Sequence, residues 1–293
     1  MTAAAAEAGG AVARAAQRAG RRRLISTLLI WLPLVWLALV LCAGMLAEEL
    51  PLADPAAQDL AEILAPPGAE HLFGADSLGR DLLARSLFGL RISIVVGISS
   101  VAIGLLFGGT LGLLAGYYRG RLETTIMALT NVVLAFPPLV LAIAITSSAG
   151  PPLLKVILAI GVLFVPAFTR IARANTLIFA DKEFVLAARA VGMRDRHVLI
   201  GEILPNLVTP LLVYSLLMVA VAIVGEASLS FLGLSVPPPA PSLGGMIAAE
   251  QSNVLDAPFA VFFPAGMLFL TVFALNLVGD QVQRRLDVRE QML

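Results

Sequence analysis

Lysine, histidine and cysteine are scarce in this chain of 293 residues, which contains two lysines, two histidines and one cysteine. A phosphate-binding loop for nucleotides needs a lysine followed by serine or threonine, whereas Lys155 precedes Val156 and Lys182 precedes Glu183. The single cysteine, Cys42, excludes an intramolecular disulfide. The sequence therefore indicates no such ATP site, and any ATP would have to be bound by a partner.

Charged residues are also rare, at 14%, whereas hydrophobic residues reach 59% and the mean hydropathy is +0.92. Soluble globular chains average about 45–50% apolar and about 25% charged residues. Several apolar runs reach the roughly 20 residues that cross a hydrocarbon layer of about 30 Å. The formal net charge is zero, so bulk charge gives no sign of a nucleic-acid partner. This composition predicts a polytopic membrane protein surrounded by lipid.

Motifs for enzymatic chemistry are absent from the sequence as well. The two histidines, His71 and His197, are far apart, and neither HExxH nor GxSxG occurs. His71 stands beside Glu70 and near Asp76, but a single histidine in a solvated loop is rarely a metal ligand. We therefore predict no catalytic residue, no cofactor-binding residue and no metal site in this chain.

Six apolar segments are long enough to cross a membrane, and each should be helical because lipid cannot satisfy irregular backbone. Pro137, Pro138 and Pro166 lie inside these segments and should bend them. The predicted fold class is an all-α polytopic membrane protein with six transmembrane helices. The predicted spans are 24–46, 90–117, 124–147, 152–173, 207–231 and 258–280.

Basic residues are distributed unevenly around these spans. Sixteen of the twenty Lys and Arg residues precede the first span, follow the second, separate the fourth from the fifth or follow the sixth. Positive charge is enriched on the cytoplasmic side of a membrane, so both termini should be cytoplasmic. The predicted division is a cytoplasmic N-terminal tail (1–23), a first transmembrane helix (24–46), an extracytoplasmic loop (47–89), a five-helix core (90–280) with a cytoplasmic loop at 174–206, and a cytoplasmic tail (281–293).

A charged segment, KEFVLAARAVGMRDRHVLIGEILPN, interrupts the apolar sequence at residues 182–206, and we call it the elbow. We expect a short helix that ends at Gly192, then a second helix that ends at Leu204 and Pro205. A short helix with small residues on one face can fit a groove on another protein. The spacing i, i+3, i+4, i+7 places on one face Phe184, Ala187, Ala188 and Val191.

Two further features lie inside the spans. The second span has glycines spaced by four, which favours close approach to another helix. These glycines are Gly104, Gly108, Gly112 and Gly116. Glu226 lies toward the outer end of the fifth span, where an acid is a candidate for function. It could line a pathway through the membrane or form a hydrogen bond between subunits.

The elbow resembles the cytoplasmic loop of bacterial ABC importer permeases, in which Glu-Ala-Ala is followed after three residues by Gly and later by Leu-Pro. Leu186 stands where that family has glutamate, and leucine cannot form an ion pair from that position. The matching residues are Ala187, Ala188, Gly192, Leu204 and Pro205.

Three other stretches resemble the dipeptide/oligopeptide permease subunits of this family. HLFGADSLGRDLLARSLFGLRISI, at 71–94, is similar to the sequence that leads into their second span. EASLSFLGLSVPPPAPSLGGMI, at 226–247, is similar to their fifth span and outer loop. FLTVFALNLVGDQVQRRLDVR, at 269–289, is similar to their last span and tail. The resemblance covers residues 24–289.

The resemblance implies a type I importer permease fold and a permease subunit of an ATP-driven peptide importer in the bacterial cytoplasmic (inner) membrane. Its implied partners are a second homologous permease subunit, two ABC ATPase subunits that bind ATP and Mg, and an extracytoplasmic solute-binding protein. The elbow would then couple the permease to an ATPase. A nickel or other small-solute importer of the same family is the alternative, and a secondary transporter or channel, or a membrane-bound scaffold, remains open.

Overall fold

The computed structural model describes residues 31–148 and 150–290, with side chains described up to residue 284. The predicted tail at 1–23, residues 24–30 of the first predicted span and residues 291–293 lie outside the described residues. Within the described part, every element is helical, and one isolated bridge pairs Ala75 with Asp81. The described elements are Trp31–Met45, α2 (Leu82–Ile103), the π-helix η1 (Gly104–Gly108), α3 (Gly109–Tyr118), α4 (Gly120–Leu134), α5 (Pro138–Thr146), α6 (Pro152–Ala180), α7 (Glu183–Ala190), α8 (Asp195–His197), the π-helix η2 (Val198–Ile203), α9 (Leu204–Phe231), α10 (Leu243–Glu250), the 3₁₀ turn η3 (Gln251–Asn253) and α11 (Pro258–Glu290).

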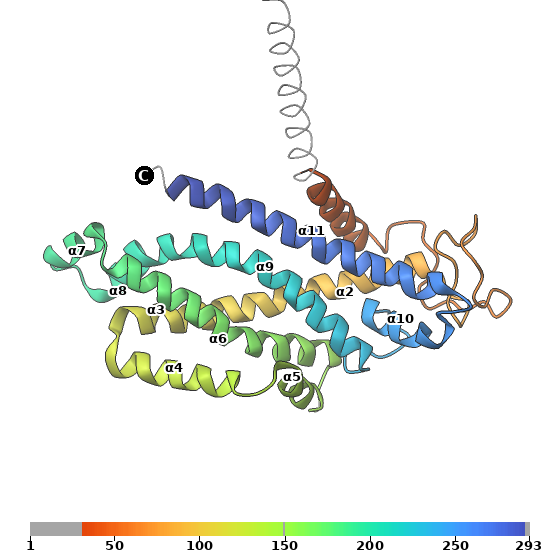
Figure 1. Ribbon diagram of the computed structural model, residues 1–293, viewed down its shortest axis with the longest axis horizontal. Helices are drawn as coiled ribbons and strands as arrows, with labels where there is room; N and C mark the ends of the chain where they lie inside the picture. The colour runs from red at the N-terminus through yellow and green to blue at the C-terminus, as the bar shows by residue number, and fades with distance from the viewer. Residues whose placement is uncertain (1–30, 149, 291–293) are drawn as a thin grey trace, which may run out of the picture.

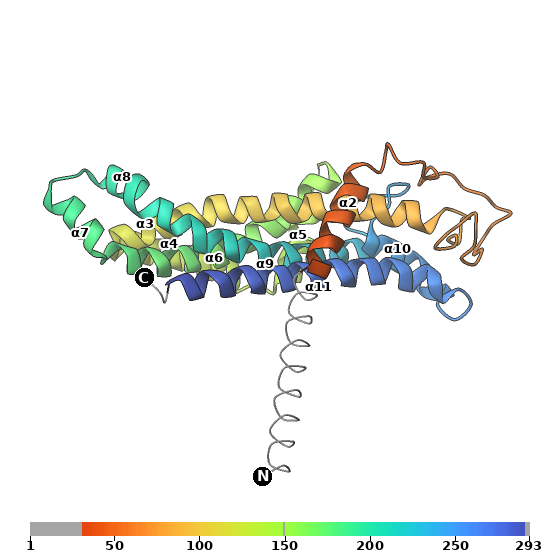
Figure 2. The same ribbon diagram turned by 90° about the horizontal axis from the view of Figure 1, so that it is seen from above.

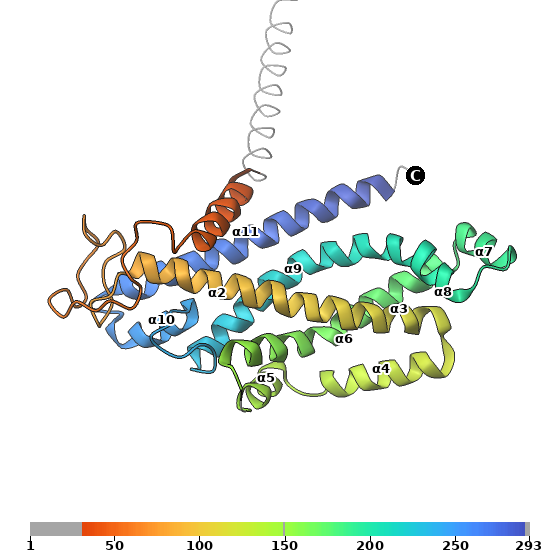
Figure 3. The same ribbon diagram turned by 180° about the vertical axis from the view of Figure 1, so that it is seen from behind.

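The long helices lie side by side along the length of the molecule (Figures 1 and 3). The elbow, with α7 and α8, forms one end, whereas α10 and the chain before α2 form the opposite end (Figure 2). Four helical stretches are long and apolar enough to cross a membrane. They are Leu82–Tyr118, Pro152–Ala180, Asp195–Phe231 and Pro258–Arg284.

The third predicted span, 124–147, is two helices rather than one. α4 ends at Leu134, α5 begins at Pro138, and the two axes differ by 84°. Pro137 has extended backbone, because a residue before a proline avoids the helical region, and Pro138 then starts a new helix. Counted as one broken span, this pair brings the total to five. The shorter apolar helix Trp31–Met45 occupies the described part of the first predicted span.

Several helices extend beyond the predicted spans. α2 begins at Leu82 instead of 90, because Asp81 caps it: the Asp81 carboxylate accepts a hydrogen bond from the Ala84 backbone N–H at 2.7 Å. α6 continues to Ala180 instead of 173, so the predicted loop at 174–206 begins as helix. The charged end of α6 is held by the ion pair between Arg173 and Glu123 of α4.

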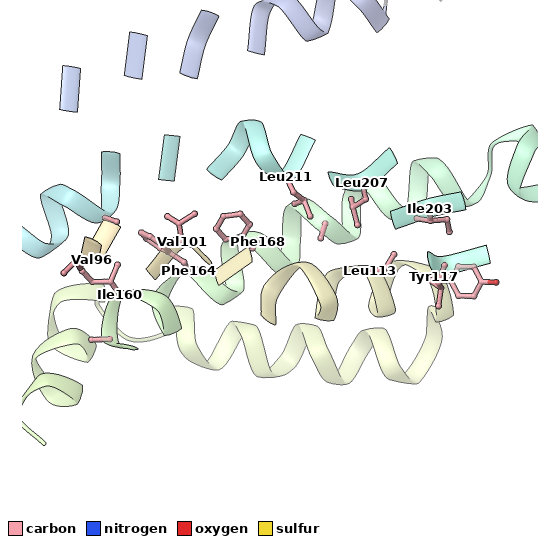
Figure 4. Close-up of a cluster of buried hydrophobic side chains, with 14 of the residues drawn as sticks. Val96, Val101, Leu113, Tyr117, Ile160, Phe164, Phe168, Ile203, Leu207 and Leu211 are labelled. Atoms are coloured by element: carbon pink, nitrogen blue, oxygen red, sulfur yellow. The ribbon is translucent and has the colours of Figure 1, made fainter. Parts of the chain in front are cut away.

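The largest apolar core lies between α2, α3, α6 and α9 (Figure 4). Phe164 and Phe168 of α6 point into it, and the Phe168 ring packs edge-on against the Tyr214 ring at 5.2 Å between centroids. The core reaches the elbow through Ile203 and Tyr117 (Figure 4). Continuous packing of this kind lets a displacement at one end of the bundle be transmitted along its helices.

Candidate functional site: the elbow and its anchors

The elbow begins with a two-turn helix that a glycine terminates. α7 covers Glu183–Ala190, and Gly192 has a φ of +84°, in the left-handed region that glycine adopts without strain. The N–H groups of Val191 and Met193 donate to the carbonyls of Ala187 and Ala188, both at 3.1 Å. These bonds satisfy carbonyls that the end of a helix would otherwise leave unpaired. A side chain at position 192 would meet no atom within 4 Å, so only the backbone conformation calls for glycine there.

The second helix of the elbow was predicted to end at Leu204 and Pro205, and this prediction was wrong. α8 runs into η2 and then into α9 without a break, so the helix continues from Asp195 to Phe231. Proline has no N–H to donate, and the π-helical turn of η2 immediately before Pro205 is a common way for a helix to absorb such a defect. Leu204 and Pro205 are both exposed on the side of this helix.

The apolar residues of α7 divide between two faces. Val185 is completely buried and packs into the main core, and half-buried Ala188 lies against the same core. This corrects the predicted face, because Ala188 is on the inward side, one turn after Val185, rather than with Phe184 and Ala187. On α7 and the turn that follows it, four large apolar side chains are more than a third exposed. These are Phe184, Leu186, Val191 and Met193.

Two contacts fix the elbow to the end of α3. The Tyr117 hydroxyl donates to Asp195 Oδ1 at 2.7 Å, across 78 positions in the sequence. The Arg189 guanidinium lies over the Tyr117 ring, with 4.7 Å between Cζ and the ring centroid. Tyr117 therefore contacts both halves of the elbow, α7 through Arg189 and α8 through Asp195. The ion pair between Arg119 and Asp181, the residue just before the elbow, is well exposed and should contribute little.

Sequence reasoning missed this anchor. Tyr117, Arg189, Asp195 and Val185 were not among the predicted site residues. The only signal was that Tyr117 follows the last glycine of the second span, at Gly116. Nothing in a single sequence pairs a tyrosine with an aspartate 78 positions later.

The four glycines of the second predicted span lie along the contact with α6. An added Cβ at Gly104 would approach Phe164 Cβ to 2.7 Å, and one at Gly116 would approach Thr176 Cβ to 2.7 Å. At Gly108 and Gly112 the obstacle is backbone, the carbonyl oxygens of Val165 and Thr169, at 2.5 and 2.4 Å. The two helices thus touch along a ridge without side chains, which joins them closely up to the elbow.

Glu226 is completely buried near the end of α9, at the opposite end of the bundle from the elbow. Its Oε2 accepts a hydrogen bond from the Ser93 hydroxyl of α2 at 2.6 Å, and its Oε1 accepts one from the Ser235 hydroxyl at 3.1 Å. Both oxygens thus have partners in the same chain. Glu226 ties α9 to α2 and to the connection that follows α9.

Within residues 31–148 and 150–290, no group of three or more His, Cys, Asp or Glu residues could hold a metal ion. The elbow presents exposed apolar side chains on a short helix, and this helix is packed against the ends of long apolar helices.

Residues 108–290 match the family model described as "binding-protein-dependent transport system inner membrane component". The chain belongs to this family, and it is accordingly an inner-membrane component that works with other transporter subunits.

Curated relatives are similar over most of the chain. The glutathione transport system permease protein GsiD of Pectobacterium atrosepticum is 42% identical over 221 residues, covering 75% of this chain and 73% of that protein. A putative peptide transport system permease protein of Brucella abortus is 37% identical over 92% of this chain and 91% of its own length. The dipeptide transport system permease protein DppC of Alkalihalophilus pseudofirmus is 39% identical over 76% of this chain and 74% of its own.

Solved structures share the fold. A chain of the MetNI methionine ABC transporter in an inward-facing conformation superposes with a TM-score of 0.57 at 19% identity, covering 70% of this chain and 95% of that chain. A chain of an amino acid ABC transporter gives a TM-score of 0.54 at 18% identity, covering 69% and 94%. The fold is therefore that of the permease chains of ABC importers.

Proposed function

We propose that this chain forms the translocation pathway of an ATP-driven peptide importer together with a second, homologous permease subunit. Two ABC ATPase subunits would bind and hydrolyse ATP with Mg, and an extracytoplasmic binding protein would deliver the peptide. The peptide substrate is supported by relatives that are named for dipeptide, peptide or glutathione transport and that match up to 92% of the chain. On this proposal the chain itself is not an enzyme.

The observation that carries the coupling role is the exposed apolar side of the elbow. Val191 is 89% exposed although it is a large apolar residue, and Leu186 is 51% exposed. A patch of this kind at the end of a rigid helix is typical of a protein–protein contact. Buried Val185 and the Tyr117 contacts hold the patch in place, so a moving ATPase would displace the ends of α3, α6 and α9.

Crosslinking tests this role. In a Cys42→Ser background, Val191→Cys should form a bifunctional-maleimide crosslink to an ATPase subunit in the assembled complex. Leu255→Cys is the matched control, because Leu255 is 92% exposed at the opposite end of the molecule. Equal crosslinking of the ATPase from both positions, or from position 255 alone, would contradict the proposal.

The substrate is tested separately with the cognate binding protein. Proteoliposomes that contain the whole complex should accumulate a radiolabelled tripeptide only when both ATP and the binding protein are present. Nickel uptake without peptide uptake would favour the small-solute importer. Uptake that needs an ion gradient but no ATP would identify a secondary transporter.

A further inference from the structure

A cavity of about 430 Å³ lies at the end of the bundle opposite the elbow. The segment just before α2, the first turn of α2, the end of α9, the connection that follows α9, and α10 line it. A volume of several hundred cubic ångströms is typical of sites for small molecules. The wall includes four charged side chains: Asp76, Arg80, Arg85 and Glu250.

Both arginines of this cavity are removed from bulk solvent, with 7% of Arg80 and 5% of Arg85 exposed. They share one carboxylate oxygen, because Arg80 Nε lies 2.7 Å and Arg85 Nε 3.3 Å from Asp76 Oδ2. The other oxygen of Asp76 accepts the backbone N–H groups of Leu78 and Arg80. Both oxygens of Asp76 therefore already have two partners each, and Asp76 can accept few further hydrogen bonds from the guanidinium groups.

Glu250 does not supply the missing acceptor. Its Oε1 accepts the backbone N–H and the hydroxyl of Ser77, at 3.1 and 2.7 Å, and its Oε2 accepts the Asn253 amide at 2.9 Å. Asp76 and Glu250 balance the two arginines in formal charge. The hydrogen bonds that Glu250 accepts, however, come from the neutral residues Ser77 and Asn253.

Hydrogen-bond donors are consequently in excess on this wall. Arg85 Nε is buried and makes no hydrogen bond, although it lies 3.3 Å from Asp76 Oδ2, whereas Arg85 Nη1 donates to the carbonyls of Pro55 at 2.6 Å and Pro239 at 3.5 Å. Among the described residues, the one hydrogen bond of the Arg80 side chain is from its Nε to Asp76, so its terminal nitrogens are available to a group in the cavity. Buried guanidinium donors without acceptors are costly, and a carboxylate is the group whose two oxygens fit them best.

We infer that this cavity binds the carboxylate of a small solute, such as the C-terminal carboxylate of a peptide, through Arg80 and Arg85. The peptide as occupant rests on the proposed function, whereas the preference for a carboxylate rests on the donors of the cavity. A solute small enough to enter a cavity of about 430 Å³ can approach the two guanidinium groups, although both arginines are more than nine-tenths buried. The surface of a docked protein would reach these groups less easily. The cavity would hold the solute at the end of the pathway opposite the ATPase contact.

The test is protection of a cysteine at the cavity. Ala249 lines the cavity and is exposed, so Ala249→Cys in a Cys42→Ser background can be modified by N-ethylmaleimide. The whole complex in nanodiscs, without binding protein, is treated in the presence of trialanine or of trialanine amide, and mass spectrometry follows the modified peptide. Trialanine should slow the modification several-fold at saturation, and the amide, which lacks the carboxylate, should not.

Two arginine variants complete the experiment. Arg80→Gln should weaken protection by trialanine about tenfold or more, because a charged hydrogen-bonded pair is lost. Arg91→Gln is the matched control, because Arg91 pairs with Glu48 on the exposed surface and should leave protection unchanged. Basal ATP hydrolysis and elution as an intact complex establish that each variant is assembled, and Arg80→Lys should protect partially if Arg80→Gln does not assemble.

Each outcome decides the question. Equal protection by trialanine and its amide, no protection by either, or unchanged protection in assembled Arg80→Gln would overturn the inference. Protection by peptide-free binding protein alone would show that this protein, rather than a small solute, covers the cavity. Peptide uptake without protection would refute the cavity and leave the proposed function standing. Protection in a complex that imports no peptide would support the cavity and contradict the proposed function.

Discussion

Single side chains near the two ends of this molecule connect segments that are far apart in the sequence. At one end Tyr117 contacts both Arg189 and Asp195. Near the other end Glu226 receives hydrogen bonds from Ser93 and Ser235. Removing one partner of such a contact leaves the other without a hydrogen bond, so substitutions at these residues should be destabilising.

Tyr117→Phe separates the two contacts of the elbow anchor. The ring under Arg189 remains, but the hydrogen bond to Asp195 is lost, which should cost about 0.5–1.5 kcal/mol in the stability of the elbow. We expect more ATP hydrolysed per molecule of solute imported, measured in proteoliposomes. Tyr118→Phe is the control, because Tyr118 is 48% exposed and no described hydrogen bond uses its hydroxyl. An unchanged coupling ratio in Tyr117→Phe would argue against the anchor.

His71 makes the segment before α2 sensitive to pH. Its Nδ1 lies 2.8 Å from Asp81 Oδ2 and its Nε2 lies 2.8 Å from Glu62 Oε2. The hydrogen bond to Asp81, together with the negative charges of Asp81 and Glu62, raises the pKa of His71 above its ordinary 6.5, although burial opposes the shift. The stabilisation is therefore complete below pH 6.5 and is lost as the pH rises through the raised pKa.

Hydrogen exchange checks this dependence. After correction for intrinsic rates, amides between Glu62 and Asp81 should exchange faster at about pH 8.5 than at about pH 6. In His71→Gln the difference should disappear. A difference of the same size in this variant would assign the effect to another group.

At the scale of elements, the second and fourth predicted spans pack closely along the four glycines. Gly112→Ala places a methyl group 2.4 Å from the Thr169 carbonyl oxygen, and backbone cannot rotate away. Separating the helices should cost about 1–3 kcal/mol, an overpacking penalty. The thermal unfolding midpoint of the purified chain should fall accordingly.

The same helix offers a matched control. A Cβ at Gly109 would lie 3.5 Å from a flexible Leu211 side chain, an ordinary contact. Gly109→Ala should therefore be neutral or slightly stabilising, because alanine favours helix over glycine. Equal destabilisation by both substitutions would mean that the close contact with α6 is not what matters at these glycines.

At the scale of the whole molecule, the elbow and the cavity lie at opposite ends of one continuous bundle (Figure 2). The apolar core between α2, α3, α6 and α9 joins them. This arrangement suits a subunit that receives a displacement at one end and changes access for a solute at the other.

The isolated chain should therefore be inactive. Reconstituted alone in vesicles, it should neither hydrolyse ATP nor transport peptide, and both activities should appear only when the other subunits are added. Solute uptake by the chain alone would contradict the need for partners and would favour a channel or secondary transporter.

The membrane class, the helical segments, the glycine that ends α7 and the resemblance to importer permeases could all be predicted from the amino-acid sequence. These follow from hydrophobicity, local backbone preference and short motifs, which neighbouring residues carry. Even Gly104, Gly108, Gly112 and Gly116 were recognisable from spacing alone, since a four-residue repeat marks one side of a helix.

Other features became visible only in the folded chain. They are the buried side of α7, the sharp bend at Pro138 and the hydrogen bond from Tyr117 to Asp195. The tertiary structure alone brought Arg80 and Arg85 together with α10 around one cavity. The physical reason is that burial and pairing depend on which surfaces meet. Partners separated by tens or hundreds of positions leave no periodic trace in a single sequence.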